Sequence, residues 1–147
     1  MKILVDADAC PVKNIVIKVA KENNISVTMF IDTSHIINDG YSEVVTVDQA
    51  RDSVDIALIN KCERGDVVIT QDYGVAALAL PKGARVISQN GLIYDNENIE
   101  NLLFERHISK KARASGGRTS GPRKRTKDDD LAFEVAFRKL IKAALIA

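Results

Sequence analysis

The sequence predicts an α/β protein with a mostly parallel central sheet of about five strands. Short runs of branched apolar residues, typical of buried strands, alternate with segments whose apolar residues recur at the spacing of one helix face. Such alternation is typical of parallel strands joined by helices. The chain has 147 residues, 46% hydrophobic and 28% charged, which is enough for one domain with its own core. We therefore expect a single domain over residues 1–147.

The first expected unit is a buried strand that begins at Ile3 and ends in two aspartates, Asp6 and Asp8. A helix should follow, because Pro11 lacks the amide that would have no intrahelical partner at a first helical position. Apolar residues at helical spacing continue this helix as far as Asn23. The elements expected next are a strand over 25–31, a loop over 32–41, a strand over 43–47, and a helix from an N-cap at Asp48 to about Cys62.

The alternation continues in the second half of the chain. A strand over 66–70 should lead through a turn at 71–74 into a short helix over 75–80, which Pro81 and Gly83 end. The elements expected after it are a strand over 85–88, a short edge strand over 91–94, and a helix from Asn98 to about Lys111.

A basic, glycine-containing loop is expected over residues 112–127, because the run from Ser115 to Pro122 breaks the regular pattern. A final helix over 128–146 opens with three aspartates, which suit the positive end of the helix dipole. Its expected buried stripe consists of Phe133, Phe137, Leu140, Ile141, Ala144 and Leu145. Because that stripe must pack on the body of the protein, the basic loop should be held at both ends.

Charge is strongly segregated along the chain, although the formal net charge is only +1. Residues 1–105 contain 9 Lys and Arg against 16 Asp and Glu, a net charge of −7. Residues 106–127 contain 9 Lys and Arg and no acid, a net +9, whereas residues 128–147 contain 3 against 4, a net −1. An acidic body with a basic loop suggests an anionic partner such as nucleic acid. The alternative is a solvated loop that only offsets the acidic body.

Carboxylates are expected at the carboxyl end of the sheet from three separate segments. Asp6 and Asp8 follow the first strand, Asp52 and Asp55 lie on the helix after the third strand, and Asp72 follows the fourth. Residues two apart on a strand, or three apart on a helix, share a direction, so each pair can reach one spot. Ligands of open α/β sheets bind at this edge.

Four or five carboxylates at one point would repel each other unless protons or cations neutralise them. Oxygen ligands without histidine or thiolate favour Mg²⁺ or Mn²⁺ over Zn²⁺. Such ions can orient a water molecule, lower its pKa and stabilise the charge that develops on a phosphate. The sequence therefore predicts a metal-dependent enzyme that hydrolyses phosphodiester bonds.

Each carboxylate also has a structural explanation. Asp8 could cap the helix at Pro11, Asp52 could complement a helix dipole, and Asp72 could make a turn. Asp6 is harder to explain in this way, because a carboxylate at the end of an apolar strand is costly without a partner. The remaining aspartates are interpreted as loop residues (Asp32, Asp39 and Asp95) or as a turn residue at the opposite sheet edge (Asp66).

Two further side chains are expected near the acids. Thr70, two residues before Asp72, could offer its hydroxyl to a phosphate or to the carboxylates. Lys13 could reach the same edge from the first turn of its helix, although a solvated lysine is the simpler interpretation.

The cysteines and histidines do not suggest a catalytic or metal site. Cys10 and Cys62 lack a metal-ligand spacing, and His35 and His107 are far apart in the sequence. A helix N-terminus near Cys10 would lower its pKa, but no partner lies nearby in sequence, so we interpret it as a packing residue. With no secretory segment and no apolar stretch that could span a membrane, we expect reduced thiols in a cytoplasmic protein that does not bind membranes.

Several of these motifs together resemble the YaiI/YqxD family of bacterial proteins, and the resemblance covers nearly the whole chain. They are the run from Val5 to Lys13, which contains Asp-Ala-Asp-Ala-Cys-Pro, the pair Asp52 and Asp55, the run from Gly65 to Asp72, the segment 116–122, and the acidic start of the last helix. That family is similar to the PIN-like nuclease superfamily. The resemblance therefore implies a PIN-like three-layer sandwich.

The resemblance also implies which residues form the site. PIN-like nucleases hold divalent metal with acids after the first strand, on a central helix and after a later strand. Carried over, this implies Asp6, Asp8, Asp55 and Asp72 as catalytic residues and metal ligands, with Asp52 as a fifth ligand. The spacing of Thr70 and Asp72 is similar to the Thr/Ser-x-Asp pattern of that superfamily. The reaction is named by this fold-level analogy.

In such a nuclease the basic loop would follow a phosphate backbone, and its glycines would let the chain approach closely. The loop residues expected to bind substrate are Gly116, Gly117, Arg118, Thr119, Ser120, Arg123, Lys124 and Arg125, together with Thr70 and Lys13. The loop has no interleaved aromatic residues, so base stacking is not expected. The expected partner is RNA or another single-stranded nucleic acid. Whether the protein forms a homodimer is left open.

Two other functions stay open at this stage. Asp-x-Asp after a first strand is also how haloacid-dehalogenase-type phosphatases begin, which would make Asp6 the nucleophile and Asp8 the general acid. Those enzymes have Thr or Val where this chain has Cys10. The other alternative is a nucleic-acid or protein binding module whose carboxylates do not catalyse. Its binding would be sensitive to salt and independent of metal.

Overall fold

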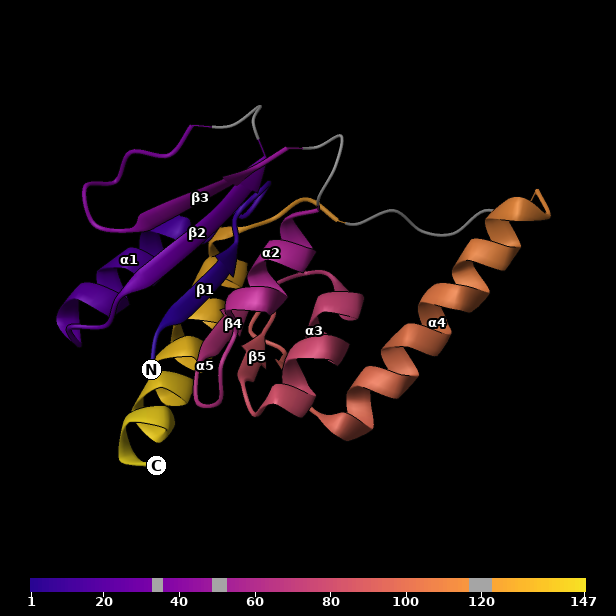
Figure 1. Cartoon of the computed structure of the whole chain (residues 1–147). Coiled ribbons are helices and arrows are strands. Elements are labelled where there is room, and N and C mark those ends of the chain that lie inside the picture. The colour runs from indigo at the N-terminus through magenta and orange to yellow at the C-terminus, as the bar shows by residue number, and fades with distance from the viewer. Residues whose placement is uncertain (33–35, 49–52, 117–122) are drawn as a thin grey trace.

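The computed structural model describes residues 1–32, 36–48, 53–116 and 123–147. Its centre is a six-stranded sheet in the order β3-β2-β1-β4-β5-β6, in which only β6 runs antiparallel to its neighbour (Figure 1). The strands are β1 (Ile3–Asp6), β2 (Val27–Asp32), β3 (Glu43–Val47), β4 (Val67–Ile69), β5 (Arg85–Ile87) and β6 (Ile93–Tyr94). The predicted α/β fold with a mostly parallel sheet is confirmed, with six strands instead of about five.

Helices cover both faces of the sheet and make the three layers. They are α1 (Lys13–Glu22), α2 (Val54–Lys61), α3 (Tyr73–Ala79), the 3₁₀ turn η1 (Leu80–Lys82), α4 (Asn96–Ala114) and α5 (Lys127–Ile146). Side chains of a strand alternate between the two faces, so Ile3 and Val5 join a core with α1 and α5. Leu4 lies between them and joins a second core with α2 and α3. None of the helices in the described ranges is long and apolar enough to cross a membrane.

The last helix, α5, completes the core on the α1 side of the sheet. Phe133 and Phe137 are fully buried and stack with their ring centroids 5.2 Å apart. Arg138 donates from Nη1 to Glu22 Oε2 at 2.6 Å, which links α5 to the end of α1. Leu145, which was predicted to belong to the buried stripe, is 51% exposed, because the helix has passed the end of the core at this point.

Several element boundaries differ from the prediction. Helix α1 begins two residues after Pro11, with Val12 at its N-cap and no side-chain cap. Helix α2 begins at Val54 with Ser53 as its N-cap, so the predicted cap at Asp48 is wrong. Helix α4 extends to Ala114, three residues into the segment predicted as loop. Basic side chains in its last turn favour this extension, because they complement the negative end of the helix dipole.

The strand order creates a topological switch point between β1 and β4. From β1 the chain continues to β2 and β3 on one side of the sheet, and from β4 it continues to β5 on the other. The segments that leave β1 and β4 therefore diverge, which opens a crevice at the carboxyl edge of the sheet. Asp6 and Asp72 stand at this crevice.

We expect Gly91→Ala to lower the stability of the protein more than Gly65→Ala, although both glycines have nearly the same positive φ (89° and 87°). A Cβ at Gly91 would lie 2.9 Å from the carbonyl oxygen of Ala132 in α5, whereas a Cβ at Gly65 would meet nothing within 4 Å. The strained φ costs both variants about 1 kcal/mol, and the clash costs Gly91→Ala about 1–3 kcal/mol more. Thermal or denaturant unfolding of the two variants measures the difference. Equal losses would show that α5 does not press on this turn.

Candidate functional site

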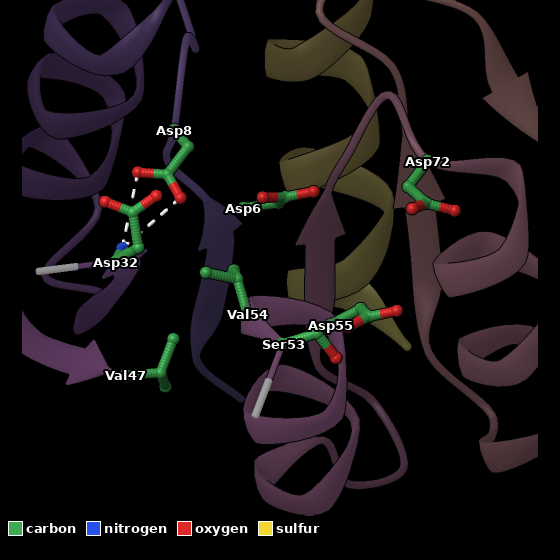
Figure 2. A pocket seen from close by; sticks show the side chains of 8 residues that line it. All are labelled: Asp6, Asp8, Asp32, Val47, Ser53, Val54, Asp55 and Asp72. Carbon is green, nitrogen blue, oxygen red and sulfur yellow. Dashed lines mark hydrogen bonds between the residues drawn. The ribbon is translucent and has the colours of Figure 1, made fainter. Parts of the chain in front are cut away.

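An acidic pocket of about 360 Å³ lies at the switch point, on the carboxyl edge of the sheet. The residues that line it are Asp6, Asp8, Asp32, Val47, Ser53, Val54, Asp55 and Asp72. Figure 2 shows Asp6 between the Asp8–Asp32 side of the pocket and the Asp55–Asp72 side. Asp6, Asp8, Asp55 and Asp72, the four aspartates predicted to be catalytic, therefore face one cavity, although they come from three distant parts of the sequence. Asp52 lies outside the described residues.

Asp6 and Asp72 are connected through Thr70. The Thr70 hydroxyl donates to Asp6 Oδ2 at 3.0 Å and accepts the backbone N–H of Asp72, also at 3.0 Å. Val5 pairs with Ile69 in the parallel register of β1 and β4. The residues that follow them, Asp6 and Thr70, therefore lie side by side. Thr70 is 2% exposed, so its buried hydroxyl links the Asp6 carboxylate to the backbone of Asp72.

Asp72 also has the structural role that the sequence suggested as an alternative. Its Oδ1 accepts the backbone N–H groups of Gly74 at 2.7 Å and Val75 at 3.3 Å, which caps α3. A second contact comes from α4, where Arg106 Nη1 lies 3.9 Å from Asp72 Oδ1. A carboxylate can cap a helix through one oxygen and still line the pocket, so the two interpretations of Asp72 are compatible.

Asp8 does not cap α1, whose N-cap is Val12. Its two carboxylate oxygens instead accept the backbone N–H of Asp32 at 3.3 and 3.4 Å (Figure 2). Asp32 itself lines the pocket, so its interpretation as a plain loop residue is wrong. It is the last residue of β2, which runs parallel to β1, and the parallel alignment brings its side chain to the same edge. This shared strand end was the sequence signal that could have identified it.

Asp55 is brought to the pocket by the start of α2. Ser53 and Val54 line the pocket beside it, and Asp55 is the acidic residue of the first helical turn. Its position at the positive end of the helix dipole offsets part of the cost of placing one more carboxylate there.

The carboxylates affect one another electrostatically. Burial raises the pKa of Asp6, and the charges of Asp72, Asp8 and Asp55 raise it further, against the lowering effect of the Thr70 hydrogen bond. The repulsion that these neighbours exert on Asp6 means that a cation in the pocket would be favourable.

Among the residues that the structure describes, no three His, Cys, Asp or Glu side chains are grouped closely enough to hold a metal ion by themselves. The described side-chain donors of the pocket are nevertheless suitable for a hard cation, since they are the carboxylate oxygens of five aspartates and the hydroxyl of Ser53. Mg²⁺ usually keeps several waters and is bound through one or two carboxylates plus substrate phosphates. A tight cage of three protein ligands is therefore not required for this ion.

A second cavity of about 370 Å³ shares Asp6 and Asp8 with the acidic pocket and includes Cys10 in its lining. Burial raises the pKa of the Cys10 thiol, as suits a packing residue and not a nucleophile. On the first turn of α1, Lys13 donates from Nζ to the backbone oxygen of Ala7 at 3.5 Å. Lys13 thus lies next to the chain segment that carries Asp6 and Asp8.

The described part of the basic loop is largely engaged with α5. Arg123 forms a bidentate ion pair with Asp129, whose pKa it lowers to about 2. Arg125 donates to Asp130 Oδ1 at 2.7 Å and to the backbone oxygen of Gln89 at 2.9 Å. Of the other loop residues predicted to bind substrate, Gly116 follows α4, Lys124 is exposed, and Gly117, Arg118, Thr119 and Ser120 lie outside the described residues. Arg123 and Arg125 thus fasten the start of α5.

The fold and the pocket define a class of protein: a three-layer α/β domain with a carboxylate-lined pocket at the switch point of a mostly parallel sheet. The chain belongs to the uncharacterised YaiI/YqxD family of bacterial proteins, whose family profile matches residues 4–143. The recognition of this family from the sequence is confirmed.

Three UPF0178 proteins of other bacteria are similar to the chain over most of its length. The chain is 64% identical over 142 residues to a UPF0178 protein of Ruminiclostridium cellulolyticum, which covers 97% of this chain and 93% of the relative. It is 58% identical over 143 residues to a UPF0178 protein of Clostridium acetobutylicum, covering 96% and 97%. A UPF0178 protein of Clostridium tetani is 54% identical over 130 residues, covering 88% and 89%. No solved structure matches the chain significantly.

We expect Asp6→Asn to stabilise the protein by about 1 kcal/mol at neutral pH, because it removes a half-buried charge that three other carboxylates repel. The raised pKa in the folded state means that ionisation of Asp6 costs stability once the pH exceeds its ordinary value of 3.8. The gain should therefore shrink as the pH falls toward that value. Thermal unfolding between neutral and acidic pH measures it.

Asp66→Asn is the matched comparison at the opposite edge. Asp66 is 2% exposed and accepts hydrogen bonds from Lys2 Nζ at 2.7 Å and from the backbone N–H of Glu63 at 2.8 Å. Loss of its charge should cost about 2 kcal/mol. If Asp6→Asn destabilised the protein as Asp66→Asn does, the hydrogen bond to the Asp6 carboxylate would outweigh the repulsion from the other acids.

Proposed function

We propose that the protein is a metal-dependent nuclease that hydrolyses phosphodiester bonds of RNA or single-stranded nucleic acid. The observation that carries the proposal is the meeting of Asp6, Asp8, Asp55 and Asp72 in one pocket at the switch point. Asp32 lines the same pocket and adds a fifth carboxylate. The described residues that line the pocket include five carboxylates and no Lys or Arg. Such negative charge favours a phosphate substrate that binds together with metal cations.

Mg²⁺ or Mn²⁺ is the proposed cofactor. Its predicted ligands are Asp6, Asp8, Asp55, Asp72 and Asp52, of which one or two would bind an ion together with water and substrate phosphate. When bound, such an ion supplies Lewis-acid stabilisation of a phosphate and a more acidic water. The chain itself fixes the positions of these acids. Thr70 holds Asp6 level with Asp72, the backbone of Asp32 holds Asp8, and the first turn of α2 holds Asp55.

Thr70 is therefore proposed as a positioning residue. Its hydroxyl already donates to Asp6 and accepts from the backbone of Asp72, and the side chain is buried. This pair of hydrogen bonds favours the carboxylate network over direct contact with a phosphate. Lys13 stays a predicted substrate contact, since its ammonium group lies beside the Asp6–Asp8 segment.

Mn²⁺ should stabilise the wild-type protein against thermal unfolding, because an ion that binds only the folded state stabilises it by mass action. At a concentration of about 100 times Kd the gain is about 2.7 kcal/mol. The gain should be lost in Asp6→Asn and in Asp72→Asn. It should be kept in Glu43→Gln, which removes an exposed carboxylate at the start of β3 that pairs with Lys61. An equal Mn²⁺ effect in all four proteins would place cation binding outside the pocket.

Asp6→Asn and Asp72→Asn should reduce Mn²⁺-dependent cleavage of single-stranded RNA at least about 100-fold while the fold is retained. The control Glu43→Gln should cleave like the wild type. Cleavage of a labelled RNA, followed on a gel with circular dichroism of each variant, makes the measurement. No cleavage of any RNA or DNA by the wild type across divalent metals would count against the proposal. Trapping of a phosphoaspartate at Asp6 with a metal fluoride would replace it with the phosphatase alternative.

A further inference from the structure

Helix α4 carries a basic stripe that begins at the acidic pocket. The stripe consists of Arg106, Lys110 and Arg113, which are spaced four and three residues apart and so share one face of the helix. All three are exposed. In Figure 1 the far half of α4 extends away from the sheet and from the other helices.

The stripe is the continuation of the face through which α4 packs on the body. Ile99 is buried in the core on the α2–α3 side of the sheet, and Leu102 packs against the same core. Arg106 follows Leu102 by one helical turn on the same side. The face that is apolar where α4 lies against the body therefore becomes basic where the helix leaves it. The stripe thus continues the face on which Arg106 lies 3.9 Å from the pocket residue Asp72.

Arg106 connects the stripe to the acids. Its Nη1 lies 3.9 Å from Asp72 Oδ1, and its side chain is 59% exposed. An ion pair this long and this exposed contributes little to stability. Arg106 can therefore exchange the carboxylate for a phosphate oxygen at little cost, and its planar guanidinium suits bidentate contact with a phosphate.

Arg123 and Arg125, which precede α5, are held more tightly than Arg106. Arg123 is paired with Asp129, and Arg125 is bound to Asp130 and to the backbone of Gln89. Both pairs fix the start of α5. The basic charge that the structure places next to the pocket is thus on α4, and not on the described part of the loop where the sequence led us to expect it.

We propose that a single strand of nucleic acid leaves the acidic pocket along α4, with successive phosphates on Arg106, Lys110 and Arg113. From Arg106 to Arg113 the helix rises about 10 Å, which is about three stacked nucleotides at about 3.4 Å each. This inference rests on the proposed nuclease function for the substrate class. The binding surface itself can be tested without any cleavage.

The test compares two double variants that remove the same charge. Lys110→Gln with Arg113→Gln removes the outer stripe and leaves Arg106 and the pocket intact. Lys139→Gln with Lys142→Gln removes two charges from α5, which covers the other face of the sheet. Glutamine has nearly the helix propensity of lysine and arginine, so both helices should persist, which circular dichroism checks.

Binding of a fluorescently labelled single-stranded oligouridine is measured by anisotropy with EDTA present, so that no cleavage occurs. We expect the stripe variant to bind about tenfold more weakly than the wild type, and its salt dependence to be shallower by about 1.4 for two lost phosphate contacts. The α5 variant should stay within about twofold of the wild type. Equal weakening in both variants would overturn the proposal, because net charge alone would then explain the binding.

Two further outcomes keep this inference separate from the proposed function. If the stripe variant loses oligouridine binding but the wild type cleaves nothing with Mg²⁺ or Mn²⁺, the stripe stands and the nuclease fails. If the wild type cleaves RNA and the stripe variant binds and cleaves equally well, the nuclease stands and the stripe fails. Unchanged RNA affinity with loss of a salt-sensitive dimer, detected by sedimentation, would assign the stripe instead to the acidic pocket of a second copy.

Discussion

Repulsion among carboxylates at one sheet edge is the constraint on which the rest of the structure depends. Five aspartates line one pocket. Burial raises the pKa of Asp6, and the charges of Asp72, Asp8 and Asp55 raise it further. The acids stay close because the surrounding structure fixes each of them. Thr70 holds Asp6 and Asp72, the backbone amide of Asp32 holds Asp8, and the first turn of α2 holds Asp55. The fold thus spends stability at this edge, as is common where a protein holds a reactive or binding site.

The acid at the opposite, amino edge of the sheet has a different environment. Asp66 directly precedes β4 and Asp72 follows it. Asp66 is almost fully buried and accepts hydrogen bonds from Lys2 and from a backbone amide. Asp66 forms an ion pair with Lys2 at the amino end of β4. Asp72 lies among other carboxylates in the acidic pocket at the carboxyl end. Both residues are aspartates, so the residue type alone does not distinguish the structural acid Asp66 from the candidate site residue Asp72. Their neighbouring charges do.

Much of the architecture could be predicted from the sequence, because the alternation of strand-like and helix-like periods extends along the chain to α4. Convergence of Asp6, Asp8, Asp55 and Asp72 followed from the same reasoning, since parallel strands all end at one edge. Asp32 was missed because the residues after it suggested a loop. That assignment ignored that β2 runs parallel to β1 and continues two residues past Phe30, the partner of Asp6, at the same edge of the sheet. The link from Arg125 to the β5–β6 turn could not be predicted, because its partners there, Asn90 and Gln89, lie 35 and 36 residues away in the sequence.

Helix α5 supplies the aromatic residues of the core between the sheet and α1, and it is the last element of the described sequence to be made. During synthesis α1 alone can cover this side of the sheet until Phe133, Phe137 and Ile141 of α5 have emerged from the ribosome. The opposite side, built from α2, α3 and the start of α4, has all its residues by then. A nascent chain should thus present the partly covered apolar face of the sheet to chaperones until α5 has been made.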